Sequence, residues 1–230
     1  DVELRNPDPV RGEELGQGGW RLPLAFVWGD DRELLSLEGD EVKVSGKAEK
    51  LARFVVREEL RKNGETYVVG TAGAVRRSEV RLARRIKAPS GVPAGAKWVH
   101  VSLPEQTLVA YEGNEPVYAA AISSGKKGYE PPTGLFQVQQ KYISTTMNAE
   151  DPIDGFYEVE EVPWTLYYHG GYALHGAYWH TDFGKVRSHG CTNIAPVDAR
   201  WLYYWSDPEV PPAWHAVRFQ PDTTWVYFTN

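Results

Sequence analysis

The sequence predicts a mainly β protein with one or two short helices, in which a small β-rich N-terminal part precedes a larger C-terminal part. Three observations support this prediction. Short runs rich in Val, Ile, Tyr and Phe recur along the chain, turn residues separate them, and a stretch rich in Pro, Gly and Ser interrupts the pattern near residues 88–96. At 230 residues, with 42% hydrophobic residues, the chain is long enough for one large or two unequal domains.

The N-terminal part, residues 1–90, contains three short β-prone runs with turns such as KNGE between them. The runs are LARFVVREEL, ETYVVGTAG and AVRRSEVRLA. This pattern is typical of a small β-rich module of the SH3-like kind, which would bind cell-wall polymer. A helix over EKLARFVVREELRK fits the same residues equally well.

Charge is distributed unevenly along the chain. Residues 53–87 carry ten Lys or Arg and four Asp or Glu, whereas the net charge of the whole chain is −6. Because the arginines alternate with apolar residues, as on solvated strand faces, we expect no nucleic-acid binding. Polyanionic wall polymers would be an equally good partner for this basic stretch. Residues 142–184 contain no Lys or Arg, and their acidic residues are Glu150, Asp151, Asp154, Glu158, Glu160, Glu161 and Asp182.

The C-terminal part, residues 97–230, has antiparallel β patterning followed by one helix. Its β-prone runs are KWVHVSL, TLVAYEG, PVYAAAIS and GLFQVQQKYIS. The spacing predicts a helix that begins at Pro196 and ends at the sequence SDP, after which AWHAVRFQPDTTWVYF returns to strand character. No apolar run approaches the roughly 20 residues of a membrane span. The first residues lack the basic and apolar regions of a targeting peptide, so we expect any such peptide to have been removed from the numbered chain.

Cys191 is the only cysteine, so the chain cannot form an internal disulfide. A cysteine nucleophile needs an imidazole to take its proton, a group that orients the imidazole, and donors for the oxyanion. Three histidines precede the cysteine closely enough to serve: His175, His180 and His189. The residues alone do not decide which of them is the base, and a buried packing role for Cys191 is the simpler alternative.

The residues around Cys191 favour a tight turn. Gly190 permits backbone N–H groups to converge beside the sulfur, and Ser188 and Asn193 provide polar side chains that could hold the turn. Three histidines and one cysteine also match zinc-ligand chemistry. However, an HxC spacing across a glycine is not a usual ligand pair and no CxxC accompanies it, so we expect no metal.

The segment HGAYWHTDFGKVRSHGCTN resembles the signature of the L,D-transpeptidase catalytic domain family, in which a His-Gly pair precedes Ser-His-Gly-Cys-x-Asn or -Arg. Upstream, WVHVSLPEQTLVAYEGNEPVYAAAISSGKKGYEPPTGLF resembles that family's opening strands. The resemblance covers approximately Lys97 to Asn230 and implies an L,D-transpeptidase-type β-sandwich. The chain departs from the family at residues 131–136, PPTGLF, where Thr-Pro-x-Gly-x-Phe is frequent.

Residue by residue, the resemblance implies that Cys191 is the nucleophile and His175 the proton donor and acceptor. The backbone carbonyl of Gly176 would orient the imidazole. The remaining implied roles belong to the turn: Ser188, His189 and Gly190 would form the oxyanion site with the cysteine, His189 being structural or assisting, and Asn193 would pin the loop. No cofactor and no metal are implied.

The resemblance also implies a function: an exported enzyme of the periplasm or cell envelope that acts on peptidoglycan stem peptides through a cysteine thioester. It would form 3→3 cross-links, exchange terminal D-amino acids, or attach the amine of a wall-anchored protein, and so serve cell-wall biogenesis or degradation and cell shape. The acidic stretch 142–184 would suit a cationic acceptor amine, and carbapenems would acylate the cysteine. Two alternatives stay open, an L,D-carboxypeptidase that uses water and a catalytically idle wall-binding module. The acceptor and the oligomeric state are not predicted.

Overall fold

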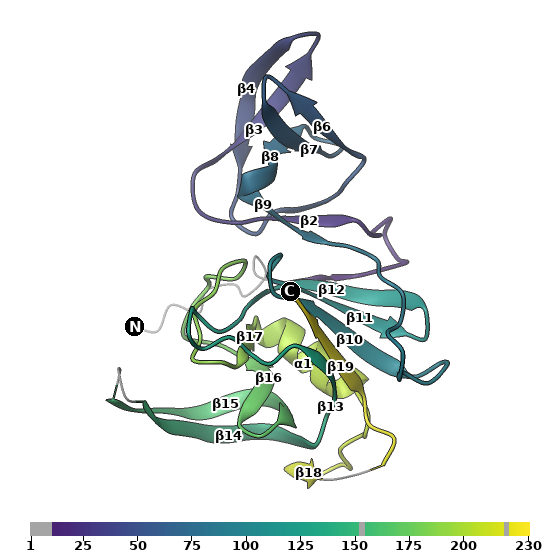
Figure 1. Cartoon of the computed structure of the whole chain (residues 1–230), viewed down its shortest axis with the longest axis vertical. Helices are drawn as coiled ribbons and strands as arrows, with labels where there is room; N and C mark the ends of the chain where they lie inside the picture. The colour runs from purple at the N-terminus through teal and green to yellow at the C-terminus, as the bar shows by residue number, and fades with distance from the viewer. Residues whose placement is uncertain (1–10, 152–154, 219–220) are drawn as a thin grey trace.

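The computed structural model describes residues 11–151, 155–218 and 221–230 (Figure 1). Within them the chain forms three β-sheets, one α-helix and one short 3₁₀ helix, η1 (Arg77–Glu79). The prediction of a mainly β fold with a short helix is therefore confirmed. No helix among the described residues is long and apolar enough to cross a membrane.

The upper body in Figure 1 consists of two small antiparallel sheets. Between two of its strands, Asn63 and Gly64 both have positive φ angles, 52° and 81°, as a tight hairpin turn requires. The segment around this turn therefore pairs as strands, and the helix considered for EKLARFVVREELRK does not form. One sheet has the order β5-β2-β9 and the other β4-β3-β8-β7-β6, with β2 (Leu24–Val27), β3 (Arg32–Glu38), β4 (Glu41–Ala48), β5 (Arg53–Val55), β6 (Glu58–Lys62), β7 (Glu65–Val69), β8 (Ala74–Arg76) and β9 (Val80–Ala83).

The lower body is one 11-stranded sheet that curls around the helix (Figure 1). Its order is β13-β19-β10-β11-β12-β17-β16-β15-β14-β18, and β1 pairs with β12 outside this path. Its strands are β1 (Glu13–Glu14), β10 (Lys97–Ser102), β11 (Thr107–Glu112), β12 (Glu115–Ser123), β13 (Gly134–Gln137), β14 (Gln140–Asp151), β15 (Gly155–His169), β16 (Tyr172–Gly176), β17 (Thr192–Ile194), β18 (Ala216–Arg218) and β19 (Trp225–Thr229).

One parallel pair inside this sheet positions the candidate site. β16 and β17 run in the same direction, with Leu174 opposite Thr192 and His175 opposite Asn193. Because Cys191 directly precedes β17, the register brings the cysteine and His175 to neighbouring strands, although 16 residues of chain separate them.

The helix α1 (Pro196–Trp205) forms where the sequence predicts it, with Pro196 at its start and Ser206 after its last turn. Its first turn contains Asp198, which is buried and accepts hydrogen bonds from the backbone N–H of Gly12 (2.7 Å) and the hydroxyl of Tyr118 (2.7 Å). Burial raises the pKa of Asp198 to about 7. The helix thus holds the N-terminal segment against the large sheet.

Both parts of the chain contribute to one hydrophobic core. Leu24, Phe26 and Leu51 from the N-terminal part pack with Trp98 and Phe183 from the C-terminal part. In addition, β1 pairs with β12, so residues 13–14, which the sequence assigned to the N-terminal module, belong to the large sheet. The domain boundary near residue 90 and the SH3-like comparison stay predictions. Deletion of residues 1–90 would open this shared core.

Half of the ten basic residues in the stretch 53–87 form ion pairs with carboxylates. Arg77 pairs with Glu105, and Arg85 pairs with Glu115 at 2.9 Å. These acids lie outside the stretch, so sequence-local charge counting overstates the positive field of the surface. The other ion pairs of the stretch are Arg53–Glu13, Arg76–Glu33, Arg76–Glu79, Arg77–Glu59 and Arg84–Glu59.

Lys141 on β14 is a buried cation, with only 1% of its surface exposed. Its Nζ donates to the backbone carbonyls of Tyr203 (2.7 Å), Ser206 (2.6 Å) and Pro208 (2.8 Å). These contacts satisfy carbonyls at the end of α1, and burial lowers the pKa of the amine to about 8.

We expect Lys141→Met to lower the free energy of unfolding by about 3–5 kcal/mol, because it leaves three carbonyls without their donor. Urea denaturation followed by fluorescence measures the change. Lys127→Met is the matched control, since Lys127 is exposed and its loss should cost less than about 0.5 kcal/mol. Equal stability of the two variants would show that the buried amine stabilises nothing.

Candidate active site

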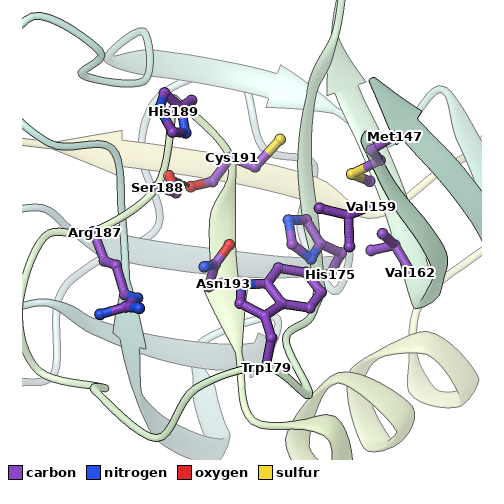
Figure 2. A pocket seen from close by; sticks show the side chains of 10 residues that line it. All are labelled: Met147, Val159, Val162, His175, Trp179, Arg187, Ser188, His189, Cys191 and Asn193. Atoms are coloured by element: carbon purple, nitrogen blue, oxygen red, sulfur yellow. Dashed lines mark hydrogen bonds between the residues drawn. The ribbon is translucent and has the colours of Figure 1, made fainter. Parts of the chain in front are cut away.

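A cavity of about 470 Å³ opens beside Cys191 (Figure 2). The end of β16 contributes His175, and the turn that precedes β17 contributes the cysteine. Of the residues predicted from the sequence, five line this cavity together. They are His175, Ser188, His189, Cys191 and Asn193.

The turn before Cys191 depends on a glycine. Gly190 has a φ of +127°, and a Cβ placed on it would lie 2.8 Å from the ring of Tyr172, so a side chain there is both strained and obstructed. Ser188 closes the turn: its Oγ accepts the N–H of Gly190 at 3.1 Å and donates to the carbonyl of Cys191. The N–H of Ser188 donates to the carbonyl of Ser124 at 3.0 Å.

The imidazole of His175 has a defined orientation. Its Nδ1 lies 3.1 Å from the carbonyl oxygen of Gly176. Because a carbonyl only accepts, Nδ1 carries the proton and Nε2 is left as the basic nitrogen. The ring lies against Trp179, with 5.8 Å between centroids, and burial lowers the pKa of His175 to about 4.

The thiol of Cys191 is partly buried, with Sγ 3.6 Å from the carbonyl oxygen of Gly171. Burial raises its pKa to about 11. Since His175 has its pKa lowered and Cys191 has its pKa raised, both groups are neutral at pH 7 in the resting site. Both shifts favour the uncharged forms of the two groups that line the cavity.

The two other histidines of the motif are engaged elsewhere. His180 accepts the N–H of Asp182 at Nδ1 (3.1 Å), and its Nε2 lies 2.8 Å from the side-chain amide of Asn193. His189 has its Nε2 3.1 Å from the Nζ of Lys126. These rings support the loop and the turn.

Among residues 11–151, 155–218 and 221–230, no three His, Cys, Asp or Glu side chains are grouped so that they could hold a metal ion. The chemistry that the arrangement can perform is proton transfer and nucleophilic attack by its own side chains. A sulfur nucleophile beside a neutral imidazole is suited to acyl transfer.

Five lining residues were not singled out from the sequence as site residues: Met147, Val159, Val162, Trp179 and Arg187. Three of these come from the long hairpin β14–β15, which forms one wall of the cavity opposite Arg187 (Figure 2). The strand alternation of β15 could have indicated Val159, because it differs in face from the acidic residues on either side.

Among the described residues of the acidic stretch 142–184, no carboxylate lines the cavity. Glu161 accepts the hydroxyl of Ser144 at 2.7 Å, and Glu158 lies on β15 next to Val159, on the alternate face. Asp154 lies outside the described residues. Neither Glu158 nor Glu161 therefore lines the cavity in which a cationic acceptor would bind.

Comparison with known proteins gives one family match. Residues 96–223 match the family described as YkuD, L,D-transpeptidase catalytic domain. A curated relative, the YciB protein of Bacillus subtilis (strain 168), carries a provisional L,D-transpeptidase name. It is 27% identical over 119 residues, which cover 46% of this chain and 59% of the relative. The matched segment thus spans about three fifths of the relative's length.

Solved structures give similar names at low identity. The catalytic domain of an Enterococcus faecium (E. faecium) L,D-transpeptidase acylated by ertapenem is 21% identical. The match covers 60% of this chain and 100% of that domain, with a TM-score of 0.47. L,D-transpeptidase 3 from Mycobacterium tuberculosis, with a faropenem-derived adduct, is 15% identical over 87% of this chain and 78% of that one, with a TM-score of 0.48.

Proposed function

Because the chain belongs to the L,D-transpeptidase catalytic domain family, we propose that it is a cysteine-dependent acyltransferase of peptidoglycan stem peptides. The observation that supports this most directly is the shared cavity of Cys191 and His175, in which the imidazole Nδ1 is held by Gly176. That arrangement leaves Nε2 to take the thiol proton.

In the first half-reaction, Sγ of Cys191 attacks the carbonyl carbon between the L-centre of the third stem residue and the terminal D-residue. Nε2 of His175 takes the thiol proton as the S–C bond forms. The carbonyl oxygen becomes an oxyanion, to which we assign the backbone N–H of Cys191 as a donor, since those of Ser188 and Gly190 already donate within the protein.

The tetrahedral intermediate then collapses. The C–N bond breaks, His175 returns its proton to the leaving amine, and the D-residue departs as a free amino acid. The donor stays on Cys191 as a thioester. In the second half-reaction an acceptor amine gives a proton to His175 and attacks the thioester carbonyl. The C–S bond breaks as the new C–N bond forms, and His175 returns the proton to the sulfur, which releases the product and restores the thiol.

His175 is the base in this proposal because His180 and His189 already contact protein groups through the nitrogens that would have to act. Its carbonyl partner keeps Nδ1 protonated throughout the cycle. Gly176 thus has the orienting function that a carboxylate has in other triads.

The acceptor decides which of several products forms. An amine of another stem gives a 3→3 cross-link, a free D-amino acid gives exchange, an amine of a wall-anchored protein gives attachment, and water gives a carboxypeptidase. For each of these products we propose that the protein acts in the periplasm or cell envelope, where its reaction would affect cell-wall turnover and cell shape.

The test is mass spectrometry of purified sacculus incubated with the protein and then digested to muropeptides. We expect 3→3 dimers, exchanged tetrapeptides or tripeptides, none of which forms with Cys191→Ala. Tripeptide alone would identify water as the acceptor. An unchanged muropeptide profile, with soluble stem peptides also left intact, would contradict the proposed activity.

A further inference from the structure

Three cations surround one carboxylate beside the catalytic cavity. Asp182 has Lys185 Nζ at 3.0 Å and Lys50 Nζ at 3.2 Å from Oδ1, and Arg187 Nη1 at 2.8 Å from Oδ2. Asp30 lies 3.7 Å from Lys50, but 78% of its side chain is exposed. Two carboxylates, of which Asp30 is largely exposed, face three cations, so the cluster keeps a net positive charge.

One member of the cluster, Arg187, reaches the cavity. Arg187 lines the same cavity as Cys191 and His175, and it directly precedes Ser188 of the nucleophile turn. Figure 2 shows Arg187 on one side of the cavity, with Met147 and Val159 on the other. The cavity therefore has an apolar wall from the hairpin and, opposite it, the cationic side chain of Arg187 from the loop that precedes the cysteine.

The N-terminal part contacts the cluster around Asp182 and helps to fix its position. Lys50 comes from the segment between β4 and β5, and its neighbour Leu51 packs in the same core as Phe183. Arg81 on β9 donates from Nε to the carbonyl of Gly184 at 2.6 Å. The cations are thus fixed by a folded framework before substrate arrives, which reduces the entropy lost on binding.

We propose that Arg187, with Lys50 and Lys185, forms a subsite for a free carboxylate of the acyl-donor peptide; this inference rests on the proposed function. Arg187 has one nitrogen on Asp182, and its planar guanidinium carries five N–H donors that suit a carboxylate. Lys50 and Lys185 act through the charge of the cluster. The donor would then be selected by its anionic side groups as well as by its scissile bond.

The test compares two donor peptides of the same sequence, one with free side-chain and α-carboxylates and one with these groups amidated. We expect the wild-type protein to prefer the free-carboxylate peptide by about 10-fold in kcat/KM, mainly through KM. Arg187→Gln should raise KM for that peptide about 10-fold and leave KM for the amidated peptide within about 2-fold. Arg187→Lys should recover part of the loss.

Lys50→Met tests the contribution of the N-terminal part, and Lys43→Met is its matched control. Both lysines belong to the same region, but Lys43 pairs with Glu41 on the exposed surface of β4. We expect Lys50→Met to weaken the preference for the free-carboxylate peptide several-fold and Lys43→Met to leave it unchanged. Thermal unfolding verifies that each variant is folded.

The outcomes separate this inference from the function on which it rests. If neither peptide nor a carbapenem acylates Cys191, the proposed function fails. If the wild-type protein acylates both peptides at equal kcat/KM, or if Arg187→Gln impairs both equally, acyl transfer stands and the carboxylate subsite is wrong.

Discussion

We expect Cys191→Ala to abolish both reactions proposed for this protein, covalent acylation by a carbapenem and peptide transfer. The thiol is the only one in the chain, so no second cysteine can replace it. We expect the rate to fall by about 10⁵-fold or more, because alanine has no atom that can form the acyl bond. Intact-mass spectrometry after incubation with ertapenem measures the adduct, and peptide mapping locates it.

The matched control is Met147→Leu. Met147 contributes the chain's one other sulfur atom and lines the same cavity, and leucine has a similar volume. This variant should acylate within about 3-fold of the wild-type rate. Cys191→Ala should stay within about 1 kcal/mol of wild-type stability, because its Sγ has one long contact to Gly171. An adduct that persists in folded Cys191→Ala would exclude the nucleophile assignment.

We expect His175→Gln to reduce the acylation rate by about 10²–10⁴-fold, which is the usual contribution of a positioned general base. Glutamine keeps a polar side chain at this buried position but has no basic nitrogen. His180→Gln is the comparison, because its ring supports Asn193 and is not assigned to proton transfer. If His180→Gln is the more damaging change while both variants are folded, the base has been assigned to the wrong histidine.

The pH dependence follows from the direction of the two pKa shifts. Burial lowers the pKa of His175 to about 4 and raises that of Cys191 to about 11. The reactive form, a neutral imidazole beside a protonated thiol, therefore persists between these values. We expect the acylation rate to stay level from about pH 8 to pH 5 and to fall only as His175 becomes protonated near pH 4.

Circular dichroism at each pH verifies that this decrease is not unfolding, because the buried neutral histidines also destabilise the fold as acid protonates them. An unperturbed imidazole would instead lose half of the rate near pH 6.5. A midpoint there, with the fold intact, would contradict the burial of the base.

Local sequence signals predicted the elements that depend on neighbouring residues. The helix at Pro196 and the Asn63-Gly64 hairpin are examples, because proline geometry and paired positive φ angles act within a few residues. The motif also indicated Cys191, His175 and the turn at Gly190. The helix and the hairpin depend on interactions between residues close together in the sequence, and the site residues belong to the recognised motif.

Contacts between distant segments could not be predicted in the same way. Lys50 reaches Asp182 across 132 residues, and Arg81 reaches Gly184 across 103. Neither basic residue has a local signal that separates it from a solvated surface charge. The sequence also gives no signal for the pairing of β1 with β12, since a strand of two residues is too short to show a hydrophobic periodicity.

The position of β19 has a consequence for how the chain is made. β19 lies between β13 and β10 in the large sheet and pairs in parallel with β10, with Trp98 opposite Trp225. This part of the sheet therefore cannot form until the C-terminal strand has been synthesised. At about 5–20 residues per second, ribosomal synthesis of the intervening segment takes on the order of 10 s. During that time the edge of β10 has no partner strand. Its apolar residues are then exposed to aggregation until β19 has been synthesised or a chaperone covers them.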